Sequence, residues 1–126
     1  MAPVTILLVD DDPLIRSLGK EALERLGYRV EVAADGAAAL AIWRSLGGVD
    51  LVIMDYNLPG EDGCQVLAKL RSLDPGAQVL MASGFFSSQD VARLKAEGAR
   101  GVIYKPFRLA ELQGQIHQVL SGLAGF

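Results

Sequence analysis

The chain has 126 residues, so we expect a single domain over residues 1–126 with its core at about 4–123. Hydrophobic residues make up 51% and charged residues 21%, and the formal net charge of -3 argues against direct nucleic-acid binding. No apolar run approaches the roughly 20 residues of a membrane helix, and the start lacks the basic and apolar stretches of a secretory signal. One cysteine excludes an internal disulfide, so we expect a reduced, cytoplasmic domain with no membrane contact.

Five short apolar runs alternate with segments of helical period. The expected strands are Val4–Val9, Tyr28–Ala33, Leu51–Met54, Val79–Ala82 and Gly101–Tyr104. The expected helices are about Pro13–Leu26, Gly36–Leu46, Cys64–Leu73 and Ser88–Glu97, followed by an apolar stripe from Leu109 to Leu123. The second strand alternates apolar and charged residues, which is typical of a half-exposed edge. Five strand–helix repeats predict an α/β fold, a doubly wound (βα)5 chain with helices on both faces of a parallel sheet.

The first helix has clear end signals. Asp12 is placed to cap its free amides, Pro13 suits its first position, and Gly27 is placed to end it in the left-handed conformation. The helical period gathers Ile15, Leu18, Ala22 and Leu26 on one apolar face of this helix.

Charged or hydroxyl residues follow four of the five strands. Asp10–Asp12 come after the first strand, Asp55 after the third, Ser83 after the fourth and Lys105 after the fifth. Each has an ordinary structural explanation when taken alone, such as a helix cap, a strand end, a turn or a surface charge. In a parallel sheet, however, the carboxyl ends of the strands meet at one edge, where ligands bind. The shared position therefore predicts a functional pocket.

The residue types in this pocket indicate phosphoryl chemistry. Carboxylates held close together repel one another unless a cation joins them, and oxygen ligands without His or Cys favour Mg²⁺. The ammonium of Lys105 and the hydroxyl of Ser83 would suit a bound phosphoryl group. A carboxylate aimed at that group is able to act as a nucleophile and carry an acyl phosphate.

Four blocks of the sequence resemble the receiver domain of two-component response regulators. They are Ile6–Pro13 (ILLVDDDP), Met54–Gly63 (MDYNLPGEDG), Ala82–Gly84 (ASG) and Tyr104–Phe107 (YKPF), in the order and spacing of the family. The resemblance covers nearly the whole chain and implies a flavodoxin-like, chemotaxis-regulator-like, three-layer α/β/α fold. The stretches Met81–Phe85 and Gly101–Phe107 are also similar to receivers at the ends of hybrid sensor kinases.

The resemblance implies a role for each pocket residue. Asp55 would accept a phosphoryl group from a histidine of a sensor kinase or a phosphotransfer protein. Asp11 would bind Mg²⁺ directly, Asp10 mainly through water, and Asp55 and the backbone carbonyl of Asn57 would complete the metal site. Such a module switches partner binding and at most assists its own phosphorylation and dephosphorylation, so we do not expect an enzyme.

Further positions follow from the same resemblance. Ser83 and Lys105 would contact the phosphoryl group, and the Lys105–Pro106 peptide bond would be cis. Pro59 and Gly63 would shape the loop after Asp55 and the start of the third helix.

The sequence departs from the family three residues before Lys105. Receivers usually carry there a Tyr or Phe that reports phosphorylation by rotating, and this chain has Val102, with its aromatic at Tyr104. We therefore expect an altered switch region, comprising Val102 and Tyr104 and relying on Phe85 or Phe86.

Two other functions remain open at this point. The first is a small Mg²⁺-dependent aspartyl phosphatase with Asp10 as its nucleophile, a reading that leaves Asp55 without a role. The second is a receiver-like interaction domain that is not phosphorylated. The sequence contains no recognition helix, so we expect no output domain in this chain, and it leaves open the kinase, the downstream protein and the formation of a homodimer.

Overall fold

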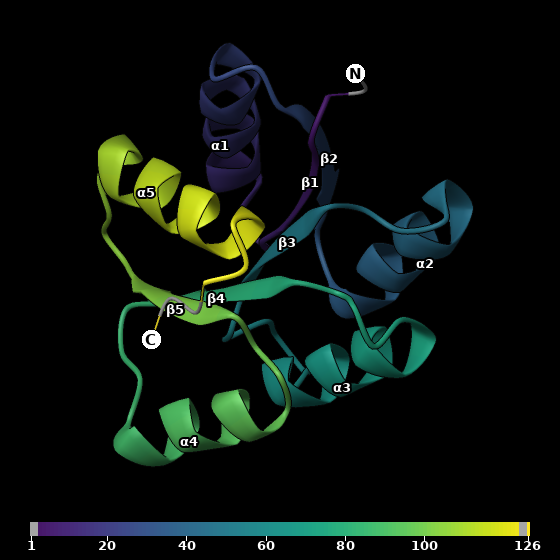
Figure 1. The fold of residues 1–126 in the computed structure, drawn as a ribbon, viewed down its shortest axis with the longest axis vertical. Coiled ribbons are helices and arrows are strands. Elements are labelled where there is room, and N and C mark those ends of the chain that lie inside the picture. Colours follow the sequence, from purple (N-terminus) through teal and green to yellow (C-terminus); the bar gives the residue numbers. More distant parts are fainter. Residues whose placement is uncertain (1–2, 124–125) are drawn as a thin grey trace.

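Five strands and five helices alternate along the chain in the computed structural model, which describes residues 3–123 and 126 (Figure 1). The strands are β1 (Thr5–Val9), β2 (Arg29–Ala33), β3 (Leu51–Asp55), β4 (Val79–Ser83) and β5 (Gly101–Tyr104). The helices are α1 (Pro13–Arg25), α2 (Gly36–Leu46), α3 (Gly63–Leu73), α4 (Ser88–Ala96) and α5 (Leu109–Leu120). Each predicted element is present, with ends that differ by a few residues at most.

The strands form one parallel sheet in the order β2-β1-β3-β4-β5. The predicted edge position of the second strand is confirmed: β2 lies at one edge, and its central Glu31 and Val32 are only partly buried. Strands β1 and β3 lie inside the sheet, where helices cover both faces, and this explains their almost unbroken apolar sequences.

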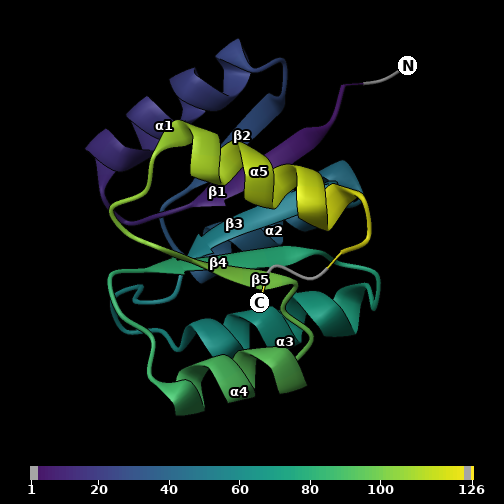
Figure 2. The same ribbon diagram turned by 60° about the vertical axis from the view of Figure 1, so that its left-hand side comes forward.

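Helices α1 and α5 cover one face of the sheet, and α2, α3 and α4 cover the other (Figures 1 and 2). Alternate side chains of a strand point to opposite faces, so β1 contributes to both cores. Ile6 and Leu8 pack toward Leu23 of α1 and Ile116 of α5. Leu7 belongs to the opposite core, which also contains the side chains that α2, α3 and α4 bury.

The ends of α1 confirm the predicted signals. The Asp12 carboxylate accepts a hydrogen bond from the Leu14 amide at 2.9 Å, and Pro13 occupies the first turn. Gly27, just beyond the helix, has a φ of +96°, which a residue with a side chain rarely adopts. These signals place the start of α1 directly beside the end of β1, where the acidic residues lie.

The apolar face predicted for α1 is only partly covered. Ala22 and Leu26 are half-buried, but Ile15 remains 40% exposed and Leu18 54% exposed. The fully buried residue of this helix is Leu23, which the predicted face did not include. Ile15 and Leu18 line a surface groove between α1 and α5 and are not enclosed in the core. Within the described residues, no helix is long and apolar enough to cross a membrane.

Candidate phosphoryl-transfer site

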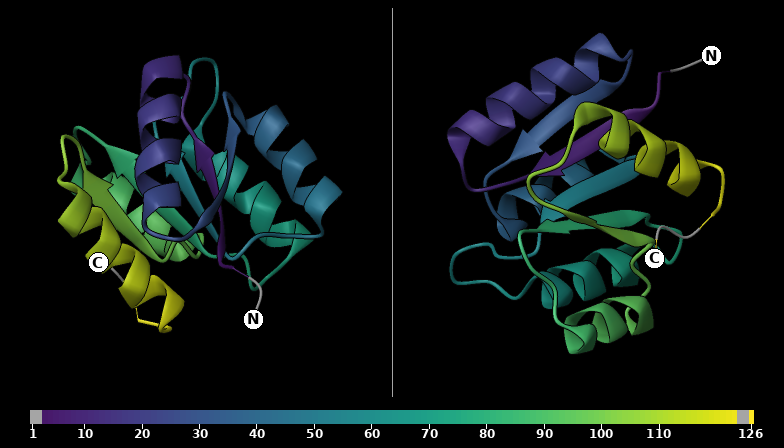
Figure 3. Two further views of the ribbon diagram at one scale, coloured as in Figure 1. Left: turned by 90° about the horizontal axis from the view of Figure 1, so that it is seen from above. Right: turned by 90° about the vertical axis from the view of Figure 1, so that its left-hand side faces the viewer.

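The predicted site residues meet at the carboxyl edge of the sheet. Asp10 follows β1, Asp55 ends β3, Ser83 ends β4 and Lys105 follows β5. The register places Asp55 beside Ala82 and Ser83 beside Tyr104 across neighbouring strands. The loops that leave these strand ends gather at one end of the molecule, as the right-hand view of Figure 3 shows.

Three carboxylates form a cluster at this edge. One oxygen from each of Asp10, Asp11 and Asp55 lies within 4.8 Å of the others, and the burial of the three residues is graded. Asp10 is buried, Asp55 is half-buried and Asp11 is exposed. An all-oxygen donor set, open to solvent on one side, fits a hard cation that keeps part of its water shell, as Mg²⁺ does. The side chains present therefore fit the predicted metal.

Lys105 is the cation that balances the cluster. Its Nζ donates to Asp10 Oδ2 at 2.8 Å and to Asp55 Oδ2 at 3.1 Å. Burial by itself lowers the pKa of Lys105, but the hydrogen bonds to Asp10 and Asp55 outweigh that effect and raise the pKa above its ordinary value. Lys105 therefore stays charged at neutral pH and holds the two carboxylates in place.

Ser83 is fully buried behind the cluster and is held by two neighbours. Its Oγ accepts a hydrogen bond from Asn57 Nδ2 at 2.7 Å and donates one to the Phe85 carbonyl at 3.0 Å. The backbone N–H of Asn57 also donates to Asp55 Oδ1 at 2.9 Å. From the sequence, only a backbone role is assigned to Asn57. The contact of its side chain with Ser83 could not be predicted, because the two residues are 26 positions apart in the chain.

Two residues that sequence reasoning missed support the pocket loops. Arg16 of α1 donates from Nη1 to the Asp10 carbonyl at 2.7 Å, which fixes the turn after β1. Glu61, in the loop after β3, accepts from the Gly36 amide at 2.7 Å and so ties that loop to the start of α2. Its position within the Met54–Gly63 block was visible in the sequence, but its partner was not.

The structure shows where the three positions expected to shape the loops lie. The Lys105–Pro106 peptide bond is cis. Pro59 is exposed at the outer turn of the loop after β3. Gly63 starts α3 against the backbone of Tyr56, where an added Cβ would come within 2.9 Å of the Tyr56 carbonyl oxygen. A side chain at position 63 would therefore displace the backbone of Tyr56, the residue after Asp55.

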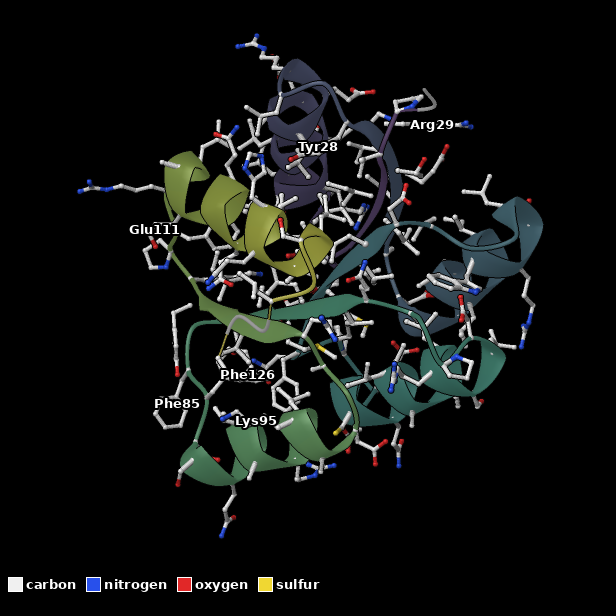
Figure 4. The ribbon with its side chains drawn as sticks, in the orientation of Figure 1. Tyr28, Arg29, Phe85, Lys95, Glu111 and Phe126 are labelled. Atoms are coloured by element: carbon white, nitrogen blue, oxygen red, sulfur yellow. The ribbon has the colours of Figure 1, made fainter. Side chains whose placement is uncertain are left out.

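The expected switch residues divide into buried and exposed groups. Val102 is buried, Tyr104 is 51% exposed, and Phe85 is 73% exposed, with its ring pointing away from the body of the protein (Figure 4). Phe86 is instead buried, with ring centroids 5.5 Å from Tyr56 and 5.4 Å from Tyr104. Of the two phenylalanines considered from the sequence, Phe86 is the one packed behind the site.

Comparison of the sequence with known proteins assigns the chain to a family. The Response regulator receiver domain model matches residues 6–117. The chain is 37% identical over 117 residues to the Sensor kinase CckA of Brucella abortus, and 35% identical over 119 residues to the Transcriptional regulatory protein TrcR of Mycobacterium tuberculosis. These alignments cover 92% and 94% of this chain, but only 12% and 46% of the two relatives. The chain therefore spans less than half the length of either relative.

Solved structures agree with the sequence comparison. The chemotaxis protein CheY4 of Vibrio cholerae superposes with a TM-score of 0.88 at 32% identity, covering 94% of this chain and 99% of that one. A CheY-like receiver domain protein of Methanospirillum hungatei gives a TM-score of 0.89 at 32% identity and covers 96% of both chains. This confirms the flavodoxin-like fold, and the chain therefore belongs to the response regulator receiver domain family.

Proposed function

We propose that this receiver domain is a phosphoacceptor, and that Asp55 takes a phosphoryl group from a phosphohistidine of a sensor kinase or phosphotransfer protein. The observation that carries this proposal is the placement of the Asp55 carboxylate. Its side chain is 13% exposed at the carboxyl edge of the sheet, bonded to the Lys105 ammonium and within 4.8 Å of two further carboxylates. Asp10, the nucleophile of a phosphatase mechanism, is less accessible to a phosphoryl donor, because its side chain is 6% exposed against 13% for Asp55.

In the transfer, a carboxylate oxygen of Asp55 forms a bond to phosphorus while the bond between phosphorus and the histidine nitrogen breaks. The backbone N–H of Asn57 and the Lys105 ammonium orient the two oxygens of the attacking carboxylate. The Lys105 ammonium is already charged and positioned before the reaction, so it stabilises negative charge on the phosphoryl oxygens during transfer.

The acidic cluster supports a metal-assisted reaction. Asp10, Asp11 and Asp55, together with the Asn57 carbonyl, are the groups that would hold Mg²⁺. When bound, the ion supplies positive charge against the phosphoryl oxygens and offsets repulsion among the carboxylates. Ser83 lies at the opposite side of the site from Asp10, and its hydroxyl is a donor for one phosphoryl oxygen after it leaves the Phe85 carbonyl.

The surface next to Asp55 supports a helical donor protein. A groove of about 500 Å³ lies between α1 and α5, lined almost entirely by apolar side chains and by Lys105 and Pro106 of the site. Ile15 and Leu18, the exposed part of the α1 face, lie along it. An apolar helix face seated there would bring a histidine on the same helix to the pocket.

Intact-mass analysis after incubation with acetyl phosphate tests the proposal. We expect one phosphoryl adduct that requires Mg²⁺ and disappears in Asp55→Asn. The matched control is Asp74→Asn, which makes the same change far from the pocket and keeps an acceptor for the Gly76 amide. It should be phosphorylated like the wild type.

Two other results would overturn the assignment. An adduct that survives Asp55→Asn and is lost in Asp10→Asn would make Asp10 the nucleophile, as in an aspartyl phosphatase. A wild-type protein that takes no phosphoryl group from acetyl phosphate or from phosphoramidate, with Mg²⁺ present, would indicate an interaction domain that is not phosphorylated. Phosphoramidate is included because its P–N bond matches that of phosphohistidine.

A further inference from the structure

The loop after β3 carries part of the site and is fixed at its near end. It covers residues 56–62, between the end of β3 and the start of α3. Asn57 supplies the carbonyl expected to bind Mg²⁺, and its side chain donates to Ser83 Oγ at 2.7 Å. That contact ties the beginning of the loop to β4. The far end turns at Gly60, where φ is +68°, and requires a separate anchor.

Glu61 is that anchor. Its Oε2 accepts a hydrogen bond from the Gly36 amide at 2.7 Å, and its own backbone N–H donates to the Leu58 carbonyl at 3.2 Å. Gly36 is the first residue of α2, where free amides form the positive end of the helix dipole. Within the described residues, no Lys or Arg side chain pairs with Glu61. The start of α2 is therefore the positive partner of this carboxylate.

Gly36 is the residue that lets Glu61 come this close. The glycine is buried, and a Cβ at this position would lie 2.9 Å from Glu61 Oε2 and 2.8 Å from a methyl group of Val66 in α3. Both distances are shorter than side chains tolerate, so a residue with a Cβ would push the carboxylate or the valine away. The glutamate and the glycine therefore fit each other as a pair.

The bond between Glu61 and Gly36 joins the loops on the two sides of β1. The strand order β2-β1-β3 places β1 between the strand that precedes α2 and the strand that precedes α3. At the end of β1, the Asp10 backbone N–H donates to the Ala33 carbonyl of β2 at 3.1 Å. Asp10 is thus tied to the chain that leads into α2, and Glu61 ties the start of α2 to the loop that carries Asn57.

This loop matters for a metal because Mg²⁺ demands near-ideal octahedral geometry. The three carboxylates of the site are placed by the ends of β1 and β3, whereas the Asn57 carbonyl is placed by the loop. A hydrogen bond to an ionised acceptor is stronger than one between neutral groups, so the Glu61 carboxylate is an effective anchor. Without it, residues 58–62 would be free to move, and the Asn57 carbonyl would be held less well.

We propose that Glu61 is a positioning residue for the metal site, and that its hydrogen bond to the Gly36 amide keeps the Asn57 carbonyl in place for Mg²⁺. This inference rests on the metal site of the proposed function. The hydrogen bond, and not the charge, performs this role. Glutamine at position 61 keeps an acceptor oxygen at the same reach, whereas aspartate keeps the charge but is one methylene too short.

Titration of the 126-residue chain with Mg²⁺, followed by NMR, tests the inference without any phosphoryl donor. The backbone amide signals of Asp11 and Asn57 report binding. We expect Glu61→Ala and Glu61→Asp to raise the dissociation constant for Mg²⁺ about threefold to tenfold, and Glu61→Gln to stay within about twofold of the wild type. Glu24→Ala is the control, because it removes the same charge at the far end of α1 and should bind Mg²⁺ like the wild type.

Hydrogen exchange of the Gly36 amide, measured in the same proteins without Mg²⁺, shows whether the bond is made. Exchange should be slow in the wild type, in Glu61→Gln and in the control. In Glu61→Ala and Glu61→Asp it should be about tenfold faster or more, because the amide loses its acceptor. A fast-exchanging Gly36 amide in the wild type would overturn the proposal.

The outcomes separate this role from the proposed function. Variants Glu61→Ala and Glu61→Asp that bind Mg²⁺ like the wild type would overturn the positioning role, even if the wild type is phosphorylated by acetyl phosphate. A Glu61→Gln protein as weak as Glu61→Ala would also overturn it, since the charge would then be the cause. Should Glu61→Ala not fold, the comparison of Glu61→Asp with Glu61→Gln decides the question.

The wild type itself distinguishes the two proposals. A wild type that binds Mg²⁺, with variants in the expected order, but takes no phosphoryl group would refute the phosphoacceptor assignment and support the positioning role. A wild type that binds no Mg²⁺ would refute the metal site and the positioning role together.

Discussion

Replacing Lys105 by methionine removes the cation from the acidic cluster and keeps most of the side-chain stem. At an effective dielectric constant of about 20, unit charges at the two observed separations, 2.8 Å to Asp10 and 3.1 Å to Asp55, attract by about 6 and about 5 kcal/mol. The cost of removing the charged groups from water offsets most of this attraction. Breaking a buried pair on one side costs about 3–5 kcal/mol, because the remaining charge is left unpaired.

The Lys105 side chain is 29% exposed, so solvent screens part of the effect. We therefore expect Lys105→Met to lower the free energy of unfolding by about 2–3 kcal/mol in Mg²⁺-free buffer, or the melting temperature by about 10 °C. Mg²⁺ binds the folded form and replaces the lost positive charge, so about 10 mM Mg²⁺ should remove more than half of the difference from the wild type.

Urea unfolding followed by circular dichroism, with and without Mg²⁺, measures this effect. Arg25→Met is the control, because Arg25 pairs with Glu21 on an exposed surface, and it should cost at most about 0.5 kcal/mol at either Mg²⁺ level. A Lys105→Met protein as stable as the wild type without Mg²⁺, or a loss that Mg²⁺ leaves unchanged, would refute the view that the carboxylates need a cation.

Three further predictions concern stability and reactivity away from the cluster. Ser87→Ala removes the α4 cap and should cost about 1 kcal/mol in urea unfolding; no loss would show that the capping box is dispensable. Gly98→Ala should cost about 1–2 kcal/mol, because φ is +90° and the new Cβ would lie 2.6 Å from Arg71 Nε; stability equal to wild type would contradict the strain. Burial raises the pKa of the Cys64 thiol, so iodoacetamide at pH 8 should label it far more slowly in the folded protein than in urea. Because the folded form keeps this proton longer, stability should also fall as pH rises above the ordinary thiol value of 9.0, and a Cys64→Ala protein with the same decline would exclude this cause.

The order of elements and the edge of the sheet that carries the site could be predicted from the sequence. Apolar runs such as Leu51–Met54 read directly as buried strands, because a strand covered on both faces needs apolar side chains throughout. The positions of Asp10, Asp55, Ser83 and Lys105 after such runs then followed from the rule that parallel strands end at one edge. The exact ends of strands and helices do not follow from composition, since backbone hydrogen bonding decides whether Asp55 belongs to its strand.

The contacts between loops could not be predicted, because local sequence carries no signal for partners that are distant along the chain. The side chain of Asn57 bonds to Ser83, and the Glu61 carboxylate accepts a hydrogen bond from the start of α2. These partners come within hydrogen-bonding distance only when the sheet and helices pack together. The choice of Phe86 over Phe85 is of the same kind: two neighbouring rings have the same chemistry, and the direction of the backbone decides which one is buried.

The sequence by itself determined the chemistry of this protein: a carboxylate cluster, a lysine and a hydroxyl, each at the end of a strand, in the pattern of a receiver. The tertiary structure alone decided how these groups are held and what lies around them. It left Ile15 and Leu18 of α1 exposed beside the site, because α1 and α5 leave an apolar groove between them. It also packed three rings behind the reactive residues, since the faces of a twisted sheet bring together side chains that the chain order keeps apart.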